Sequence, residues 1–294
     1  MTENCSSKIL FIINPKAGAG GMDWHQLITD YYALSNAKIE IFKLPENCSG
    51  QMIVAKINAS IPQVVVAVGG DGTIKLVAAC LINKDIKLGI LPAGSANGLA
   101  KELGISEDTD EALRIIENEN CKKIHVTNIN GQLCIHLSDI GFNAYAMKGF
   151  SGQQIRGMWG YVEAYLKILF KSPLMEVEML IDEKTIKIKA VMIVIANATK
   201  YCTGAIINPI GKLDDDMFEV IAVKKISIRE LFKMTFSHAL YDLNKTEIFQ
   251  VHTLVMKSVK KVHFQVDGEY IGLVNEVKAV LVKDALKIII PAAS

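Results

Sequence analysis

Short β-branched and aliphatic runs alternate with segments of helical period over roughly the first hundred residues. Each run is followed by a segment whose apolar spacing suits a helix, and the runs lie at Ile9–Ile13, Lys38–Leu44, Val64–Val68 and Lys87–Leu91. Parallel strands need crossover connections of this kind, usually helical. The pattern therefore predicts an α/β domain built on a doubly wound parallel sheet.

The pattern changes after Cys121. Lys122–Ile129 and Gln132–Ser138 read as strands around Asn130-Gly131, which is a strong hairpin-turn dipeptide. Further strands are expected at Met175–Ile181, Thr185–Ala196, Met217–Lys224, Thr253–Lys257, Lys260–Val266 and Val277–Val282, with helices at Gly157–Phe170 and Ile228–Leu240. The second half is therefore predicted to be mostly antiparallel β structure.

The last apolar run, Leu286–Ile290, has apolar residues at consecutive positions, as in a strand that is buried on both faces. We expect this run to return to the first sheet as an added strand. The chain has 294 residues, which suits two domains. We predict one domain at residues 1–123, with 285–294 returning to it, and a second at residues 124–284.

Composition narrows the class of protein. Half of the residues are apolar, and 32 Lys and Arg balance 31 Asp and Glu, so no bulk positive charge favours nucleic acid. The six cysteines form no CxxC pair, which favours a reducing compartment. The first apolar run is too short for a signal peptide, and the longest, Ala190–Ala196, is far below the roughly 20 residues of a membrane span. We expect a cytoplasmic protein without a transmembrane span.

Three glycine-bearing loops each follow a predicted parallel strand. The first, Asn14–Gly21, could present backbone amides to a phosphate. It lacks the Gly-Lys-Ser/Thr of a Walker loop, and Asp23 stands where a dinucleotide fingerprint has its third glycine. An ordinary tight turn remains an alternative interpretation of this loop.

The second loop, Gly69-Gly70-Asp71-Gly72-Thr73, has three glycines around one carboxylate. This composition leaves room for a triphosphate beside a metal-directed or hydrogen-bonding Asp71, and Thr73 could cap the next helix. In the third loop, Leu91–Gly98, Ser95 or Asn97 could cap the following helix. Because ligands bind beyond the carboxyl ends of parallel strands, the loops are expected to form one pocket.

These loops and several later segments resemble the diacylglycerol kinase catalytic-domain superfamily, which includes sphingosine kinases and soluble bacterial lipid kinases. The later segments are Gly141-Phe142, Asn197 to Gly204 with Pro209, Leu213-Asp214-Asp215 and Asp267-Gly268-Glu269. The matches keep the family order over nearly the whole chain. The resemblance implies an ATP-binding α/β domain followed by a β-sandwich domain, with the site in the cleft between them.

The resemblance also implies roles for individual residues. The residues expected to hold the ATP phosphates are Asn14, Pro15, Lys16, Gly18, Gly69, Gly70, Asp71, Gly72, Thr73, Gly94, Ser95 and Asn97. Asp71 would help to position the magnesium nucleotide. Asp267 would be the base that takes the proton of the lipid hydroxyl, with Glu269 as its neighbour on the same strand face. From the residues alone, Val266-Asp267-Gly268-Glu269 is also a good hairpin corner.

A structural Mg²⁺ is implied by the same resemblance. Its ligands would be the Asp215 side chain and the backbone carbonyls of Lys212 and Met217. The sequence departs from the family pattern at two places. Asp216 replaces the glycine that usually follows the Asp pair, and Asn143 stands where many relatives have an aspartate.

The leading functional hypothesis is an ATP- and Mg²⁺-dependent lipid kinase. It would transfer the γ-phosphate to the hydroxyl of a long-chain lipid alcohol, such as diacylglycerol or sphingosine, at the inner face of a membrane. A homodimer is one option for its assembly. The alternatives are a kinase of a soluble acceptor such as NAD, and a catalytically silent nucleotide- or lipid-binding protein.

Lys257, Lys260 and Lys261 form a basic cluster that could favour an anionic membrane or simply be a solvated strand end.

Overall fold

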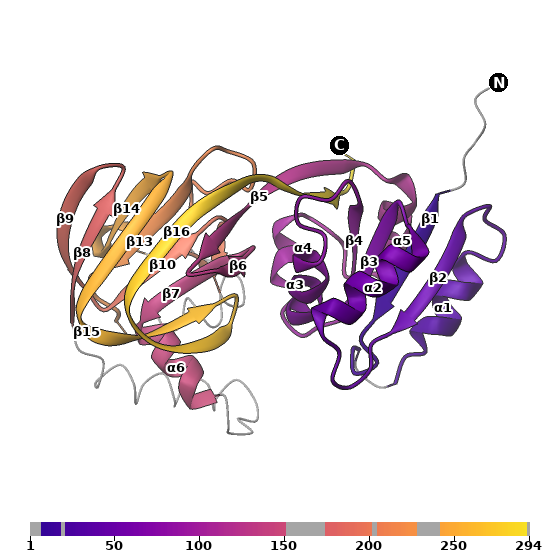
Figure 1. The fold of residues 1–294 in the computed structure, drawn as a ribbon, viewed down its shortest axis with the longest axis horizontal. Coiled ribbons are helices and arrows are strands. Elements are labelled where there is room, and N and C mark those ends of the chain that lie inside the picture. The colour runs from indigo at the N-terminus through magenta and orange to yellow at the C-terminus, as the bar shows by residue number, and fades with distance from the viewer. Residues whose placement is uncertain (1–6, 19–20, 151–173, 202–204, 228–241, 293–294) are drawn as a thin grey trace. The chain divides into compact units, whose positions relative to one another are not determined.

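The chain folds into two units, which we describe one at a time. The computed structural model describes residues 7–18, 21–150, 174–201, 205–227 and 242–292 (Figure 1). The first unit comprises Met1–Ile124 and Asp284–Ser294, and the second comprises His125–Lys283. The chain therefore passes between the units twice.

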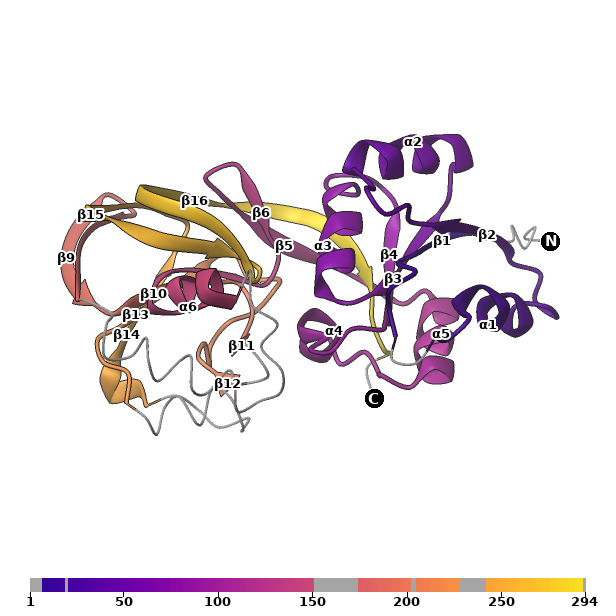
Figure 2. The same cartoon turned by 90° about the horizontal axis from the view of Figure 1, so that it is seen from below.

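A parallel sheet forms the centre of the first unit. Its strands are β1 (Lys8–Ile13), β2 (Lys38–Lys43), β3 (Val64–Gly69) and β4 (Lys87–Pro92), in the order β4-β3-β1-β2. The helices are α1 (Trp24–Tyr31), α2 (Gly50–Ser60), α3 (Asp71–Ala79), α4 (Gly98–Glu102) and α5 (Thr109–Asn118). Helices cover both faces of this sheet (Figure 2), so the predicted doubly wound α/β fold is confirmed.

Successive side chains along a strand point to opposite faces of the sheet, so the position of a residue in the strand determines which helices it packs against. Ile9, Phe11 and Ile13 point to one face of β1 and belong to a buried cluster with Trp24 of α1 and Leu113 of α5. Both faces of the sheet are covered, and every residue of β3 is accordingly buried. Continuous apolar runs in this part of the sequence therefore reflect a sheet enclosed between two helical layers.

The end of the chain adds a strand to this sheet. The last strand, β16 (Glu269–Ile289), pairs in parallel with β4, with Lys287 opposite Lys87 and Ile288 opposite Leu88. The expectation that the last apolar run returns to the first sheet is therefore confirmed.

The second unit is mostly antiparallel β structure. Its elements are β5 (Cys121–Ile129, which begins in the first unit), β6 (Gln132–Cys134), β7 (Leu137–Gly141), α6 (Phe142–Phe150), β8 (Met175–Ile181), β9 (Lys184–Ala190), β10 (Met192–Ala196), β11 (Lys200–Tyr201), β12 (Ala205–Ile206), β13 (Phe218–Val223), a 3₁₀ turn (Leu243–Lys245), β14 (Thr246–Val251), β15 (Thr253–Val266) and β16. The strands follow the order β14-β13-β10-β7-β15-β16, and β8 and β9 extend the sheet from β15. A buried apolar cluster, including Phe218 and Phe264, fills this sandwich-like unit.

Some predicted strands differ from the observed ones. The run predicted at Gln132–Ser138 is divided into β6 and β7, because the intervening amides bond to a carboxylate rather than to a strand. The run at Thr185–Ala196 is divided at Val191, whose amide bonds to the Val223 carbonyl at 2.9 Å.

Other predicted runs proved longer than expected. Thr253–Lys257 and Lys260–Val266 are parts of the single strand β15, which is bulged between them. Val277–Val282 and the run predicted at Leu286–Ile290, except its last residue, likewise belong to the single strand β16. β14 and α6 were not predicted, and the helices expected at 157–170 and 228–240 lie outside the described residues.

Candidate functional site

The three glycine-bearing loops meet at the carboxyl ends of β1, β3 and β4. Backbone hydrogen bonds join them: the Gly18 amide donates to the Ala93 carbonyl at 2.9 Å, and the Ala93 amide donates to the Gly69 carbonyl at 2.9 Å. The Asn14 amide also donates to the Val68 carbonyl at 3.0 Å. The Gly18–Ala93 hydrogen bond joins residues 75 positions apart, and the loops therefore form one cluster of backbone groups.

Glycine is required where these loops touch. A Cβ on Gly94 would lie closer to the Gly70 Cα than non-bonded carbons approach, and 2.8 Å from the Asn97 Oδ1. A Cβ on Gly69 would lie 2.6 Å from the Thr73 hydroxyl. Gly18 has a φ of +93°, which an L side chain rarely adopts. Packing within the cluster thus accounts for glycine at these positions independently of any ligand.

Asn14 links the first loop to the second. Its Nδ2 donates to the Thr73 hydroxyl at 3.0 Å, and its Oδ1 accepts from the Lys16 amide at 3.0 Å. Thr73 lies inside α3, which begins at Asp71 after the N-cap Gly70, so the capping role expected for Thr73 is wrong. The Lys16 ammonium is exposed and lies 3.0 Å from a Glu46 carboxylate oxygen. Lys16 therefore places a positive charge at the rim of the loops.

Asp71 and Asn97 organise the third loop. The Asp71 Oδ1 accepts from the Leu99 amide at 3.2 Å, so Asp71 caps α4, and the cap expected from Asn97 is absent. Asn97 instead closes its own loop, since its Oδ1 accepts from the Gly94 amide at 2.8 Å and its Nδ2 donates to the Gly94 carbonyl at 2.9 Å. The same Nδ2 donates to Glu107 at 2.8 Å. The Asn97 side chain therefore shapes the loop.

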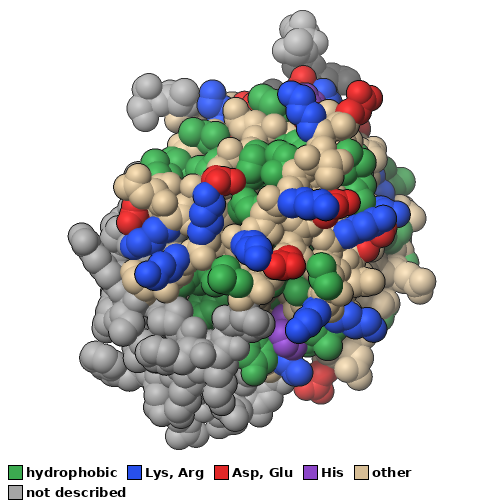
Figure 3. All heavy atoms as spheres, turned by 90° about the vertical axis from the view of Figure 1, so that its left-hand side faces the viewer, with side chains coloured by type: hydrophobic (Ala, Val, Ile, Leu, Met, Phe, Trp, Pro, Cys, Tyr) green, Lys and Arg blue, Asp and Glu red, His purple; other side chains and the backbone are tan. Residues whose placement is uncertain are grey.

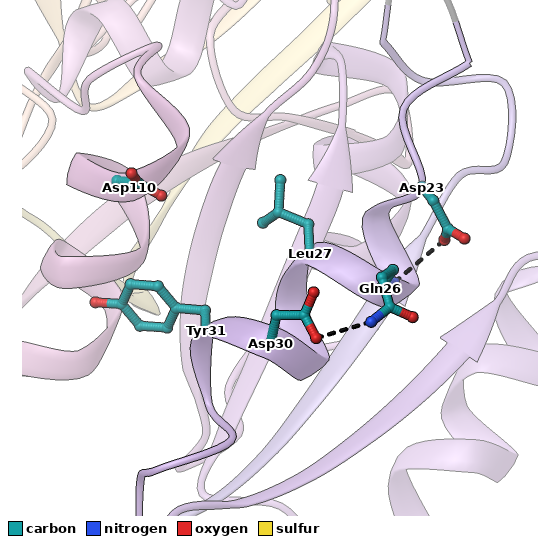
Figure 4. A pocket seen from close by; sticks show the side chains of 6 residues that line it. All are labelled: Asp23, Gln26, Leu27, Asp30, Tyr31 and Asp110. Carbon is teal, nitrogen blue, oxygen red and sulfur yellow. Dashed lines mark hydrogen bonds between the residues drawn. The ribbon is translucent and has the colours of Figure 1, made fainter.

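The described part of the first unit also has a pocket of about 510 Å³ between α1 and α5 (Figure 4). It is lined by Asp23, Gln26, Leu27, Asp30, Tyr31 and Asp110. Three carboxylates in this lining would repel a phosphate, and none of the lining residues belongs to the predicted phosphate set. The pocket is therefore separate from the candidate nucleotide loops.

Asp267 lies in a two-residue turn between β15 and β16. Val266 pairs with Glu269 across the turn, and Asp267 and Gly268 have φ values of 48° and 83°. These values are typical of a type I′ hairpin, so the hairpin corner suggested by the residues alone is confirmed. Asp267 is in the turn and Glu269 is the first residue of β16, so the expected sharing of one strand face is wrong.

Three consecutive amides hold the Asp267 carboxylate. Its Oδ2 accepts from the Ile135 amide at 3.1 Å, and its Oδ1 accepts from the His136 and Leu137 amides at 3.0 and 3.1 Å. Ile135 and His136 form the connection between β6 and β7, and Leu137 begins β7, about 130 residues earlier in the chain than Asp267. The sequence reasoning missed them, because no local pattern marks a backbone donor. The carboxylate is consequently fixed in one orientation.

A buried polar network supports the same turn. Asp139 is fully buried, and its Oδ2 accepts from Asn143 Nδ2 at 2.7 Å and Gln265 Nε2 at 2.5 Å, while its Oδ1 accepts from the Ala144 amide at 2.9 Å. Gln265 Oε1 in turn accepts from the Gly268 amide at 2.7 Å. Asn143 therefore acts as a donor to a buried carboxyl group, and an aspartate at this position would place a second carboxyl group against Asp139.

The loop at 212–217 contains a buried oxygen that suits a cation. Asp215 Oδ1 is shielded from solvent and has no hydrogen-bond partner among the described residues. Nearby, burial raises the pKa of the Glu219 carboxyl, and the charge of Asp215 raises it further. No three side chains of His, Cys, Asp or Glu gather as a metal site in the described ranges, so a cation here would depend on Asp215 and on carbonyl oxygens. Asp215 therefore fits the implied Mg²⁺.

Asp216 does not disturb this loop. Its φ is not among the positive values found in the described residues, so its position does not require glycine. Its carboxylate lies 2.9 Å from the Lys283 ammonium, which holds the pKa of Asp216 below its usual range. The backbone at this position therefore does not need glycine, and the Asp216 side chain adds an ion pair with Lys283.

Magnesium should stabilise the protein through Asp215. When the free magnesium concentration is about ten times the Kd for this site, binding is expected to add about 1.4 kcal/mol to the free energy of unfolding. Denaturant titrations with and without magnesium measure this gain. Asp215→Asn should remove it, whereas the control Asp216→Asn should retain it. A gain that persists in Asp215→Asn would rule out this ligand.

Comparison with known proteins places this architecture in a class. Residues 8–129 match the diacylglycerol kinase catalytic domain, and residues 139–290 match the YegS C-terminal NAD kinase beta sandwich-like domain. These two matches, together with the similarity to proteins named as lipid kinases, define a lipid kinase. This chain belongs to the diacylglycerol kinase family, in the form that carries a YegS-type second domain.

Individual relatives are similar over different shares of the chain. An uncharacterized protein of Synechocystis is 30% identical over 201 residues, which is 64% of this chain and 46% of the relative, so the match spans about half of that protein. The diacylglycerol kinase of Bacillus subtilis is 26% identical over 77% of this chain and 78% of its own length. A probable lipid kinase YegS of Escherichia coli is 43% identical over 26% of this chain and 28% of its own length.

Solved structures share the fold. The crystal structure of a putative diacylglycerol kinase from Bacillus anthracis aligns with a TM-score of 0.78 and 22% identity, covering 98% of this chain and 99% of that chain. In the described part of the chain, no helix combines the length and the apolar character needed to cross a bilayer.

Proposed function

We propose that this protein transfers the γ-phosphate of ATP to the hydroxyl of a lipid alcohol. The observation that carries the proposal is the union of three glycine-bearing loops by backbone hydrogen bonds at the carboxyl edge of a parallel sheet. The diacylglycerol kinase family match and the lipid substrate in the name of the Bacillus subtilis relative support a lipid acceptor.

The loop residues would hold the triphosphate mainly through backbone amides. Gly70 and Gly94 let two loops approach closely, which concentrates donors in a small volume. The Lys16 ammonium, which pairs with Glu46, would add positive charge. Asp71, with one oxygen held by the Leu99 amide, would orient the magnesium nucleotide. Bound Mg²⁺ would neutralise charge on the transferring phosphate.

Asp267 would receive the proton of the lipid hydroxyl. An alcohol becomes a better nucleophile as its proton leaves, and a base must be held within hydrogen-bond reach of that proton. The three amides at 135–137 fix the carboxylate, and Gln265 fixes the turn that carries it. Glu269, exposed at the start of β16, would contribute charge next to this base.

A lipid alcohol is presented by a membrane, so we place the reaction at a bilayer surface. Cys48, Cys80, Cys121 and Cys134 are free thiols, which supports a reducing compartment and therefore the inner face of the membrane. Diacylglycerol, sphingosine and related long-chain alcohols are the substrate class.

The test is phosphate transfer from radiolabelled ATP to diacylglycerol, sphingosine, ceramide or related alcohols in mixed micelles with magnesium. Asp71→Ala is expected to lower the rate by about 100-fold or more, because it removes a charged group beside the phosphates. Asp30→Ala is a matched control on α1 and should keep the rate. If none of the lipids is labelled at any magnesium concentration, the proposal is wrong.

A kinase of a soluble acceptor is the second candidate, because the second domain matches a model described as NAD kinase beta sandwich-like. Incubation of the protein with ATP and NAD in the absence of lipid tests it directly. Phosphorylation of NAD without lipid labelling would favour this candidate. Calorimetric ATP binding without transfer to any acceptor would instead indicate a silent binding protein.

A further inference from the structure

Strand β15 carries a wide bulge at residues 258–261. Lys257 pairs with Glu276 of β16 and Val262 pairs with Val274, so residues 258–261 lie opposite Asn275 alone. On its other side, β15 pairs with β8 as far as Ser258 and with β7 from Phe264 onward. The bulge therefore marks the point where β15 changes neighbours, and residues 259–261 lie outside the ladders on both sides.

Apolar side chains are held outward at this place. Val259 is 81% exposed, and the Ser258 hydroxyl donates to the Lys260 carbonyl at 2.7 Å, which fixes the bulge around it. Leu174 is 58% exposed and directly precedes β8, at the end of that strand that lies beside Ser258. A single exposed apolar residue needs no explanation, but Val259 and Leu174 are two at the same end of the β8–β15 pair, and we call them the apolar patch.

Lysines surround this patch. Lys260 and Lys261 are exposed and have no ion pair within 4.0 Å among the described carboxylates, while Lys257 and Lys278 share Glu276 at 3.7 and 2.8 Å. On the neighbouring strands β8 and β9, by contrast, Lys187 pairs with Glu178 and Lys189 pairs with Glu176. Figure 3 shows such intermixing of basic and acidic side chains over one face of the molecule. The bulge is therefore locally cationic.

We propose that this surface, formed by Leu174, Lys257, Val259, Lys260 and Lys261, docks the protein onto an anionic bilayer. Val259 and Leu174 would enter the boundary between headgroups and acyl chains, and the lysines would lie against lipid phosphates. Apolar burial and electrostatic attraction would then both contribute to membrane binding. The proposal rests on the proposed lipid kinase function and adds how that enzyme reaches its substrate. Exposed lysines can also simply prevent sheets from pairing, and that role is the alternative outcome.

Vesicle sedimentation with the full-length protein tests the docking surface. The vesicles are phosphatidylcholine alone, or phosphatidylcholine with about 30% phosphatidylglycerol to give an anionic surface. The wild type should bind only the anionic vesicles, and binding should fall as NaCl rises from about 0.05 to 0.5 M. Lys260→Glu/Lys261→Glu should weaken binding by about 30-fold or more, and Val259→Asp by several-fold.

The control is Lys38→Glu/Lys184→Glu, which makes the same change in net charge at exposed positions away from the bulge. It should alter vesicle binding less than about twofold. Equal weakening by both double variants would assign vesicle binding to overall charge. If neither double variant weakens binding, the role left for the lysines is to prevent pairing between sheets. Either result overturns the proposal.

The kinase assay in uncharged micelles separates this proposal from the function on which it rests. If lipid is labelled in micelles but Lys260→Glu/Lys261→Glu binds anionic vesicles like the wild type, the docking surface is wrong and the kinase stands. If the bulge variants lose vesicle binding but the wild type labels no lipid, the docking surface stands and the kinase is wrong.

Discussion

Gly94→Ala is expected to weaken ATP binding by about 100-fold, because displacements near 1 Å at a binding site have effects of this size. The new Cβ would be forced against the Gly70 Cα and the Asn97 Oδ1, so the second and third loops would have to separate. The amides of both loops would then no longer converge on one phosphate group. Calorimetric titration with ATP and magnesium measures the change.

Gly50→Ala provides the matched control for this prediction. Gly50 lies at the start of α2 in the same unit, and a Cβ there would meet only the Cys80 sulfur, at an ordinary 3.6 Å. Its ATP affinity should stay within about twofold of the wild type, since no predicted phosphate contact changes. If Gly94→Ala binds ATP as tightly as Gly50→Ala does, the contact between the loops does not shape the nucleotide site.

Asp267→Asn is expected to lower the rate of lipid phosphorylation by about 10³-fold, which is within the range of a general base, while ATP affinity stays unchanged. The same change should reduce the free energy of unfolding by about 1–3 kcal/mol. An asparagine keeps one acceptor oxygen but turns an NH₂ group toward backbone amides that need an acceptor. Single-turnover transfer and denaturant unfolding measure the two effects.

A control variant makes the Asp267 prediction specific. Glu247→Gln removes an exposed carboxylate that pairs with Lys224 in the same unit, and it should change neither the transfer rate nor the ATP affinity appreciably. A loss of stability in Asp267→Asn with near-normal transfer would assign Asp267 a structural role alone.

The parallel domain was predictable because its determinants are local. Continuous apolar strands such as Val64–Val68 and glycines just beyond them are visible in short windows of sequence. Parallel strands bring their carboxyl ends to one edge, so the meeting of the loops at Gly18, Gly69 and Gly94 followed from topology. The determinants of the turn at Asp267-Gly268 are local as well, because residues that adopt left-handed backbone conformations are the ones that a two-residue hairpin turn needs.

The surroundings of Asp267 could not be predicted in the same way. Its partners are the backbone amides of Ile135, His136 and Leu137, and any residue type can supply an amide. Gln265 occupies an ordinary strand position in the sequence, and only the fold brings it against Asp139. The strand break before β7 has the same origin, because a distant carboxylate competes there with the ladder for backbone donors.

The pairing of Ile288 with Leu88 joins residues 200 positions apart, so the N-terminal unit cannot finish folding when its own first 124 residues have been made. During synthesis, one side of β4 stays unpaired until residues 287 and 288 have left the ribosome, although the other strands of that sheet are already present. Contacts so distant in sequence form slowly, and an unpaired strand edge invites aggregation in the meantime. A nascent chain arrested before residue 287 should therefore be degraded more readily than the released protein.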